Sequence, residues 1–405
     1  MPPGGLLTDR IGIGVLTRLV PRDLVDEVLA ETGRRGKRSR LLPAHVVVYF
    51  VMALAIFRDG YEEVMRRLTG GLVFMRAWRR DWAVRALFER VAAPVAGPGA
   101  PGAWLGSRRL MAIDGVKLDV PDTPANVAGF GRPGGVTRRP FPQIQVLGLG
   151  ECGTHAVVAA EIGTLSVGER ELAAGLAGSM EAGMLVIADR GFFSFGFWRD
   201  CQLTGADLLF RVASGLKLPV IQALPDGSFL SEVAAPKVRS SGFKVPLAAA
   251  SDPRNATHIP VRVVEYAVAA AGGSGKPETF RLISTILDPD DVTAIELAAA
   301  CQQRWEYEIS LREIETQMPE PGRGLRSRTP ELVRQELRGL LLAHYAIRSL
   351  MAEAAVSAGL DPDRLSFMRS ISLIRRQVTD QAAFPPRQAR ARAGHGDQRN
   401  PRESQ

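Results

Sequence analysis

Three acidic residues occupy positions from which their carboxylates could share a metal site. Asp114 lies in the predicted strand MAIDG, Asp189 follows the apolar residues of MLVIAD, and Glu308 lies in the middle of a predicted helix. Site residues of α/β proteins commonly lie at such strand ends. Three carboxylates on one sheet edge and a facing helix can hold two Mg²⁺ ions about 3.5–4 Å apart. The chemistry that these residues predict is metal-dependent displacement at a phosphodiester.

Each of these assignments has alternatives, because most Asp and Glu side chains are merely solvated. For Asp114 the rivals are Asp119 and Asp122, and for the helical acid they are Glu306 and Glu313. The acids are far apart in the chain, so only folding could bring them together.

Helical spacing favours Glu308 as the third acid. Cys301, Arg304, Glu308 and Glu315 are separated by three, four and seven residues, so they share one helix face. Arg304 then lies one turn from Glu308, where it could bind a phosphate beside the metal ions. The aromatic residues between them are expected to pack within the protein rather than stack on bases: Trp305 and Tyr307.

The basic residues of the chain are almost all arginines. Lys and Arg number 51 against 43 Asp and Glu, a formal net charge of +8, and only six of the 51 are lysines. Arginine makes planar, bidentate contacts to phosphate, so this excess indicates a polyanionic partner. Codon usage in a GC-rich genome is the alternative explanation, because Ala, Gly and Pro are abundant too.

Cysteine and histidine point to no metal or disulfide framework. Cys152, Cys201 and Cys301 contain no C-x-x-C pair, which suits a reducing cytoplasm and argues against structural zinc. The five histidines lack metal-binding spacing and are expected to be structural or surface residues. No signal peptide is indicated, and the longest apolar run, Val46 to Phe57, is about half of a bilayer span.

The order of predicted elements indicates an α/β protein with a mixed sheet covered by helices on both faces, of the ribonuclease H type. Three adjacent strands are followed by alternating helices and strands. The helix that carries Glu308 is predicted to begin at Asp290 and Asp291 and to end near Gln317. The predicted organisation is a helical N-terminal domain at 1–105, the first part of the core at 106–213, a β-rich insertion at 214–289, a helical completion at 290–380, and a disordered basic tail at 381–405.

Four blocks of sequence resemble the insertion-sequence-4 family of DDE transposases. They are IDG at 113–115, ADRGFFSF at 188–195, QRWEYEISLREIE at 303–315, and an N-terminal stretch similar to the family's helical domain. The third block resembles the signature Y-x2-R-x3-E-x6-K, which falls on Cys301, Arg304, Glu308 and Glu315. The resemblance extends to about residue 380.

This resemblance implies a function and a set of partners. It implies a ribonuclease H-like core interrupted by the β insertion, and cut-and-paste transposition through hairpinned ends. The implied partner is double-stranded DNA, both the terminal inverted repeats and the target, bound by a homodimer. Asp114, Asp189 and Glu308 become ligands of two Mg²⁺ ions, for which Mn²⁺ can substitute, and Arg304 becomes a phosphate contact. Work on chromosomal DNA implies a cytoplasmic, nucleoid-associated bacterial protein without a membrane partner.

Two departures from the signature leave an alternative open. The signature Tyr is Cys301 and the signature Lys is Glu315, so a catalytically impaired, DNA-binding remnant is the second hypothesis. We expect Glu315 to repel the DNA strand, with Arg312 partly neutralising it. A stand-alone ribonuclease H-like nuclease is a third hypothesis, which the long insertion and the helical N-terminal domain disfavour.

Clustered basic residues are the expected DNA contacts, and a solvated surface is the alternative. One cluster lies between helices of the N-terminal domain, a second follows the signature helix, and two further candidates adjoin the acidic residues. The members are Arg34, Arg35, Lys37, Arg38 and Arg40; Arg323, Arg326 and Arg328; and Arg190 and Arg312.

Overall fold

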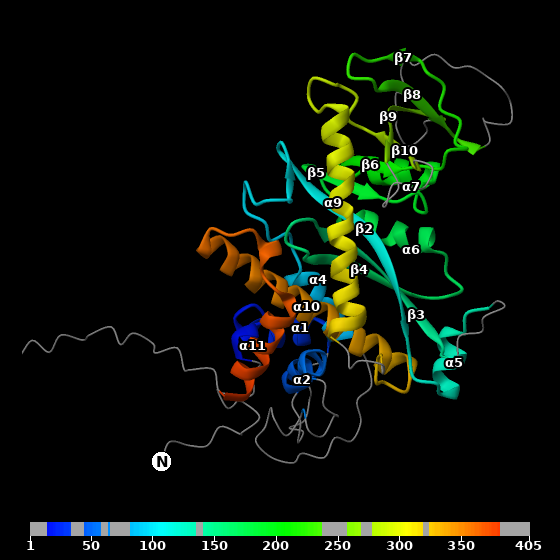
Figure 1. Ribbon diagram of the computed structural model, residues 1–405. Coiled ribbons are helices and arrows are strands. Elements are labelled where there is room, and N and C mark those ends of the chain that lie inside the picture. Colours follow the sequence, from blue (N-terminus) through cyan, green and yellow to red (C-terminus); the bar gives the residue numbers. More distant parts are fainter. Residues whose placement is uncertain are drawn as a thin grey trace, which may run out of the picture.

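A computed structural model shows a central mixed sheet with helices on both faces and a group of helices at one end (Figure 1). Within the part of the chain that the structure describes, no helix is long and apolar enough to cross a bilayer. The predicted basic cluster at 34–40 and the tail at 381–405 lie outside the described residues. The structure describes residues 14–33, 44–57, 64, 82–134, 141–236, 257–268, 278–318 and 324–380.

The sheet has ten strands in the order β4-β3-β2-β5-β6-β10-β9-β8-β7, and β1 pairs with β2. β4, β3 and β2 are antiparallel, β5 and β6 run parallel to β2, and the remaining strands continue antiparallel from β6. The strands of the first part are β1 (Trp104–Leu105), β2 (Arg108–Asp119), β3 (Gln143–Glu151), β4 (Val157–Thr164), β5 (Met184–Ala188) and β6 (Asp207–Arg211). This mixed sheet confirms the predicted α/β, ribonuclease H-like fold.

The strand-rich segment predicted at 214–289 extends the same sheet. β10 pairs with β6, so the insertion continues the sheet edge. Its strands are β7 (Gln222–Ala223), β8 (Phe229–Ala234), β9 (His258–Val268) and β10 (Glu278–Ser284).

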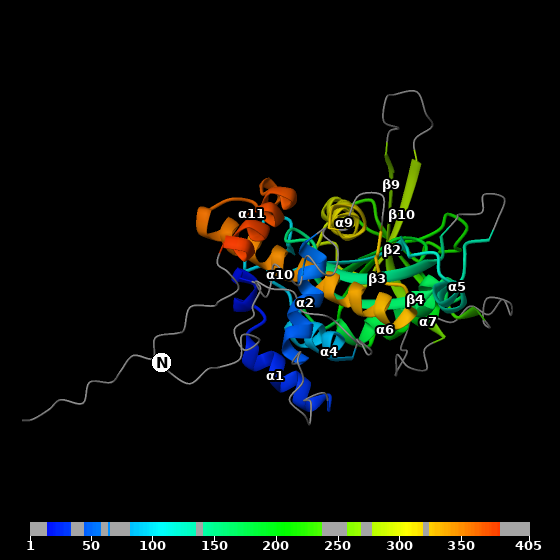
Figure 2. The same cartoon turned by 90° about the horizontal axis from the view of Figure 1, so that it is seen from below.

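Alternate residues of the central strands face two hydrophobic layers, as the two-residue period of a strand requires. In β2, Leu110 and Ala112 belong to one buried cluster and Met111 and Ile113 to the other. The second layer contains α6 (Glu169–Leu176), η3 (Ala177–Ser179) and α7 (Phe195–Gln202), and α9 (Ala294–Arg312) lies on the opposite face (Figure 2). α9 continues into a π-helical turn, η5 (Glu313–Gln317).

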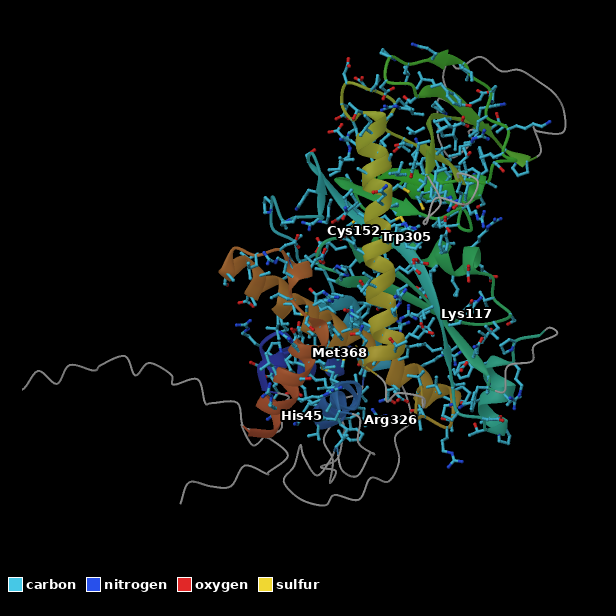
Figure 3. All side chains as sticks on the ribbon, viewed as in Figure 1. His45, Lys117, Cys152, Trp305, Arg326 and Met368 are labelled. Atoms are coloured by element: carbon cyan, nitrogen blue, oxygen red, sulfur yellow. The ribbon has the colours of Figure 1, made fainter. Side chains whose placement is uncertain are left out.

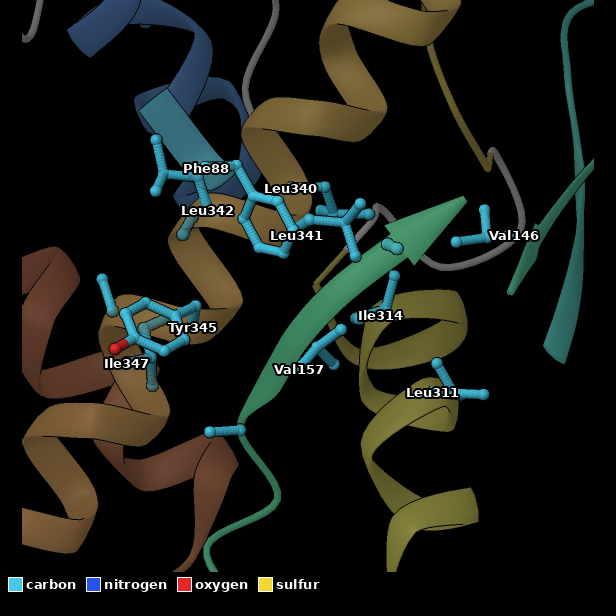
Figure 4. Packing of buried hydrophobic residues seen from close by; sticks show 14 of the residues in the cluster. Phe88, Val146, Val157, Leu311, Ile314, Leu340, Leu341, Leu342, Tyr345 and Ile347 are labelled. Carbon is cyan, nitrogen blue, oxygen red and sulfur yellow. The ribbon is translucent and has the colours of Figure 1, made fainter. Parts of the chain in front are cut away.

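The N-terminal helices and the longest C-terminal helix form one continuous core. α2 is buried along almost its whole length because it is apolar all round, as expected of an interior helix. A side chain at Gly339 of α10 would collide with Val51 of α2, so glycine permits their close approach. Leu340, Tyr345 and Phe88 lie in this core (Figure 4). The helices are η2 (Gly14–Arg18), α1 (Arg22–Glu31), α2 (Ala44–Ile56), α4 (Trp82–Val91), α5 (Pro124–Phe130), α10 (Pro330–Ala358), η6 (Pro362–Arg364) and α11 (Phe367–Asp380).

α9 begins later than the sequence prediction. Asp291 lies before the helix, where its carboxylate accepts a hydrogen bond from Arg108 Nη2 at 2.6 Å. Thr293 is the N-cap, and it forms a reciprocal capping box with Glu296. The predicted start was wrong because the T-x-x-E pattern, a stronger signal than two acids, was present three residues further on.

Candidate active site

Strand pairing places Asp114 and Asp189 side by side. Ile113 of β2 is opposite Ala188 of the parallel strand β5, and each acid is the next residue in its chain. Ile113 faces the layer of α6 and α7, so Asp114 points to the other face, where α9 lies. The parallel register thus brings the two acids together at the end of β5, on the sheet face that α9 covers.

α9 brings the third acid to the same face of the sheet. Arg304 Nη1 donates to Asp114 Oδ2 at 2.6 Å, and Glu308 lies one helical turn further on. Burial raises the pKa of the Asp114 carboxyl, the Arg304 guanidinium and the Gly115 N–H oppose that rise, and the charges of Glu308 and Asp189 add to it. Three acids and one guanidinium therefore influence one another directly.

Two glycines in β3 determine how closely α9 lies on the sheet. Tyr307 is fully buried, and its ring lies against Gly148 and Gly150. A Cβ atom at Gly150 would collide with the ring itself, and one at Gly148 would collide with the Tyr307 hydroxyl oxygen. Tyr307 thus packs as predicted, and because it is next to Glu308, its contact with the sheet sets the distance between the sheet and the helix that carries Glu308. The alternating glycines of VLGLGE were a signal for this contact that the sequence prediction did not use.

Asp189 has an oxygen that suits a cation. Its Oδ1 is buried and accepts no hydrogen bond within the described residues, and Arg211 Nη1 is 3.8 Å away. Arg211 ends β6, the strand beside β5, and its guanidinium also pairs with Glu278 and stacks over Phe280. Arg211 was not among the residues predicted from the sequence, although it is the last residue of the strand beside the one that precedes Asp189.

The three acids do not converge as closely as we expected. Among the described residues, one group of three ligand-type side chains has all its ligand atoms within 4.8 Å of one another, and it is a different group. The ion pair between Arg304 and Asp114 explains the separation, because a guanidinium occupies the place of a cation. The donor set of three carboxylates and the unsatisfied Asp189 oxygen still fit hard divalent ions, which prefer oxygen ligands. Arg304 must release Asp114 for such ions to bind.

The rival acids have partners elsewhere. The Asp119 carboxylate accepts from Gln143 Nε2 at 2.7 Å, and Asp122 pairs with Arg132 at 2.5 Å. Glu313 is buried against His344 and Arg348, which lower the pKa of its carboxyl against the opposing effect of burial. Glu306 faces the C-terminal segment, as described below.

The two departures from the signature have distinct surroundings. Cys301 is buried in α9, and its side chain interacts with the hydroxyl of Tyr266 in β9, so a tyrosine hydroxyl from the sheet lies beside this position. Glu315 is exposed, and it lies in the π-helical turn, where Met318 N donates to Glu313 O at 3.0 Å. The helical segment therefore ends at Gln317, as predicted, but its last turn is π-helical rather than α-helical.

The other residues predicted to contact DNA or to pack have different environments. Arg190, Arg312 and Arg328 are exposed, and Arg323 lies outside the described residues. Arg326 was predicted to face DNA, but its guanidinium binds the backbone carbonyls of Leu54 and Phe57, so its role is structural. Trp305 was predicted to pack, but it is 58% exposed on α9 (Figure 3), because the outer side of this helix is uncovered.

Comparison with known proteins identifies relatives over most of the chain. Residues 10–93 match the family model described as insertion element 4 transposase N-terminal, and residues 105–346 match the transposase DDE domain. The chain is 28% identical over 383 residues to the transposase InsG for insertion sequence element IS4 of Escherichia coli (strain K12), covering 90% of this chain and 83% of the relative. A piggyBac transposase in a synaptic complex with hairpin DNA shares 11% identity at a TM-score of 0.45, covering 91% of this chain and 80% of that one.

Proposed function

Because this chain belongs to the insertion-element-4 group of DDE transposases, which are polynucleotidyl transferases, we propose that it moves its own insertion sequence by cut-and-paste. It binds the terminal inverted repeats, cleaves the strands at the element ends through hairpinned intermediates, and joins them to target DNA. Metal-dependent displacement at phosphodiester bonds accounts for each step.

The single observation that supports this proposal best is the register between β2 and β5. It places Asp114 beside Asp189 on the sheet face that α9 covers, and α9 carries Glu308 and Arg304. The Asp189 Oδ1 atom is buried and accepts no hydrogen bond within the described residues. An acid that is merely solvated has its oxygens in contact with water, whereas an oxygen that binds a metal ion needs no hydrogen bond.

The residues of the site divide the work between metal binding and DNA positioning. Asp114, Asp189 and Glu308 would hold two Mg²⁺ ions, with Mn²⁺ as a substitute. When bound, the ions supply activation of the attacking oxygen and stabilisation of the leaving oxygen. Arg304, released from Asp114, contacts the scissile phosphate, since a guanidinium binds phosphate oxygens in a bidentate manner. Arg211 lies on the other side of Asp189, where it neutralises excess negative charge.

Exposed arginines extend this site along the DNA. Arg190 directly follows Asp189, Arg312 is in the last turn of α9, and Arg328 precedes α10. Their positive charge suits a duplex backbone. Paired ends require two active sites, so we propose a homodimer on DNA, working in the cytoplasm on the nucleoid.

The impaired remnant is the second candidate, and the two signature departures favour it. Cys301 and Glu315 replace a hydroxyl and a cation of the signature. The Tyr266 hydroxyl beside Cys301 compensates for the first departure, whereas no residue of the described part of the chain forms an ion pair with Glu315 to compensate for the second.

A cleavage assay on the element's own ends separates the hypotheses. Inverted repeats found in the DNA that flanks the gene are labelled and incubated with the full chain and Mg²⁺. Hairpin and strand-transfer products support the transposase, binding without products supports the remnant, and unspecific degradation supports a nuclease. The matched control is the same DNA with a scrambled repeat, which a transposase leaves uncut.

A further inference from the structure

A second group of ligand-type side chains lies behind α9. The imidazole of His155, in the turn between β3 and β4, meets the carboxylates of Glu306 in α9 and Asp363 in η6. One ligand atom from each of the three lies within 4.8 Å of the other two. Three segments distant in sequence thus converge on one point.

Each member of this group is fixed by its own surroundings. The His155 side chain is 3% exposed, its backbone adopts a φ of 62°, and its N–H donates to Glu151 O at 3.0 Å. A positive φ is unfavourable for a residue with a Cβ atom, so the turn holds the imidazole in place. The Asp363 N–H donates to Asp361 Oδ1 at 3.0 Å, which orders the loop.

The group carries more negative than positive charge. His155 Nε2 and Asp363 Oδ1 lie 2.6 Å apart and share a proton, and a carboxylate oxygen of Glu306 lies within 4.8 Å of a ligand atom of each. Two carboxylates and one imidazole therefore face one point, where a cation can take the place of the shared proton.

We propose that His155, Glu306 and Asp363 form a binding site for a divalent transition metal, with Zn²⁺ as the preferred ion. One imidazole and two carboxylates form a donor set that suits Zn²⁺, whereas Mg²⁺ prefers oxygen ligands alone. The Asp363 side chain is 36% exposed, which leaves a path for the ion and a place for a water ligand. Binding displaces the shared proton to solvent, as metal binding to protonated ligands does.

The distances require only a small adjustment. Two ligands of a tetrahedral zinc ion are roughly 3.3 Å apart when each bond is about 2.0 Å long. The 2.6 Å between the His155 and Asp363 atoms is shorter, as expected of a hydrogen bond that the metal replaces. An outward movement of the exposed Asp363 side chain provides the difference.

This site is separate from the three catalytic acids. Glu306 precedes Glu308 by two residues, which places it about 200° around the helix. Arg304 donates to Asp114 on one side of α9, whereas the Glu306 carboxylate lies with His155 and Asp363. The metal links α9 to the β3–β4 turn and to η6, so it holds the helix that carries Glu308.

Zinc binding to the full chain tests this proposal without any DNA. The protein is stripped of metal with a chelator, and ZnCl₂ is titrated while heat of binding and melting temperature are recorded. We expect one ion per chain and a rise in melting temperature. Asp363→Asn should weaken Zn²⁺ binding at least tenfold, since even residues that only support a ligand cost about 10–100-fold.

The matched control is Asp361→Asn, which removes the same charge from the same loop but no ligand. It should bind Zn²⁺ like the natural sequence, and so should Asp114→Asn, which alters the catalytic acids. Absence of a Zn²⁺-dependent melting shift, equal loss in the Asp361 and Asp363 variants, or competition by equimolar Mg²⁺ would each overturn the proposal. These readouts are independent of transposition, so a failure of the proposed function leaves them unaffected.

Discussion

A methyl group added at Gly148 should misplace the catalytic helix. The Cβ of Gly148→Ala would lie less than 3.0 Å from the Tyr307 hydroxyl oxygen, a separation that Cβ atoms in proteins essentially never show. The same Cβ would lie 3.5 Å from the ring carbon Cζ and 3.4 Å from Val157 Cγ1, which are ordinary van der Waals contacts. The collision therefore involves the hydroxyl alone. Tyr307 is fully buried, so the ring cannot turn away and α9 must shift instead.

The expected magnitudes follow from this geometry. Restoring van der Waals contact requires a displacement of about 1 Å, and overpacking of this kind costs about 1–3 kcal/mol of stability. A misplacement of about 1 Å in an active site costs on the order of a hundredfold in rate. We therefore expect Gly148→Ala to lower the free energy of unfolding by about 1–3 kcal/mol and DNA-end cleavage by about a hundredfold, although no catalytic acid changes.

A compensating variant makes this prediction specific. The Tyr307 hydroxyl has no hydrogen-bond partner within the described residues, so Tyr307→Phe alone should cost little. The double variant Gly148→Ala/Tyr307→Phe removes the colliding oxygen and should recover both stability in urea and single-turnover cleavage. Gly196→Ala, whose Cβ meets nothing within 4 Å, is the control for an added methyl group. Natural activity in Gly148→Ala, or no recovery in the double variant, would show that the Tyr307 hydroxyl does not position α9 through Gly148.

Three further predictions concern charge. Arg328→Ala should reduce the slope of log DNA affinity against log salt concentration by about one, because Arg328 is exposed. Arg326→Ala should lower the free energy of unfolding and leave this slope unchanged, because Arg326 binds backbone carbonyls. Equal slopes for the two variants and the natural protein would show that Arg328 does not contact DNA. Glu315→Lys should strengthen binding of the cognate repeat, most at low salt, and identical affinities across a salt series would contradict this. Burial lowers the pKa of His344 in the folded protein, and the nearby Glu313 carboxylate opposes this effect. The neutral imidazole therefore contributes its full stability above the unfolded-state pKa of about 6.5, and this contribution is lost as the pH falls from there towards the folded-state pKa. An NMR titration midpoint of the His344 imidazole at or above about 6.5 would show the sign to be wrong.

Features that depend on local pattern could be predicted from the sequence. The apolar strand MLVIA ends at Asp189, and MAIDG is a strand that contains Asp114, as the residue types indicate. The spacing of Arg304 and Glu308 placed them one turn apart, and the structure has Arg304 on Asp114. These inferences needed only strand and helix periodicity.

Features that depend on pairing between distant segments could not. Nothing near Arg211 in the sequence says that β6 lies beside β5, and the contact of Tyr307 with Gly148 depends on how α9 crosses the sheet. The scattered histidines lacked metal-binding spacing, but folding brings His155 to two acids from other segments. Arg326 illustrates the reverse error, because a basic loop residue can bind backbone carbonyls as readily as phosphate.

Single-turnover cleavage of the cognate end by Asp189→Asn tests the metal site most directly. The control is Asp122→Asn, which changes an exposed acid that pairs with Arg132. If Asp189 binds the metal ions, Asp189→Asn should lower the cleavage rate with Mg²⁺ by at least about a hundredfold, a loss of several kcal/mol of transition-state stabilisation. The DNA affinity of Asp189→Asn and the cleavage rate of Asp122→Asn should stay near their natural values. Cleavage by Asp189→Asn at the natural rate, or an equal loss in Asp122→Asn, would contradict it.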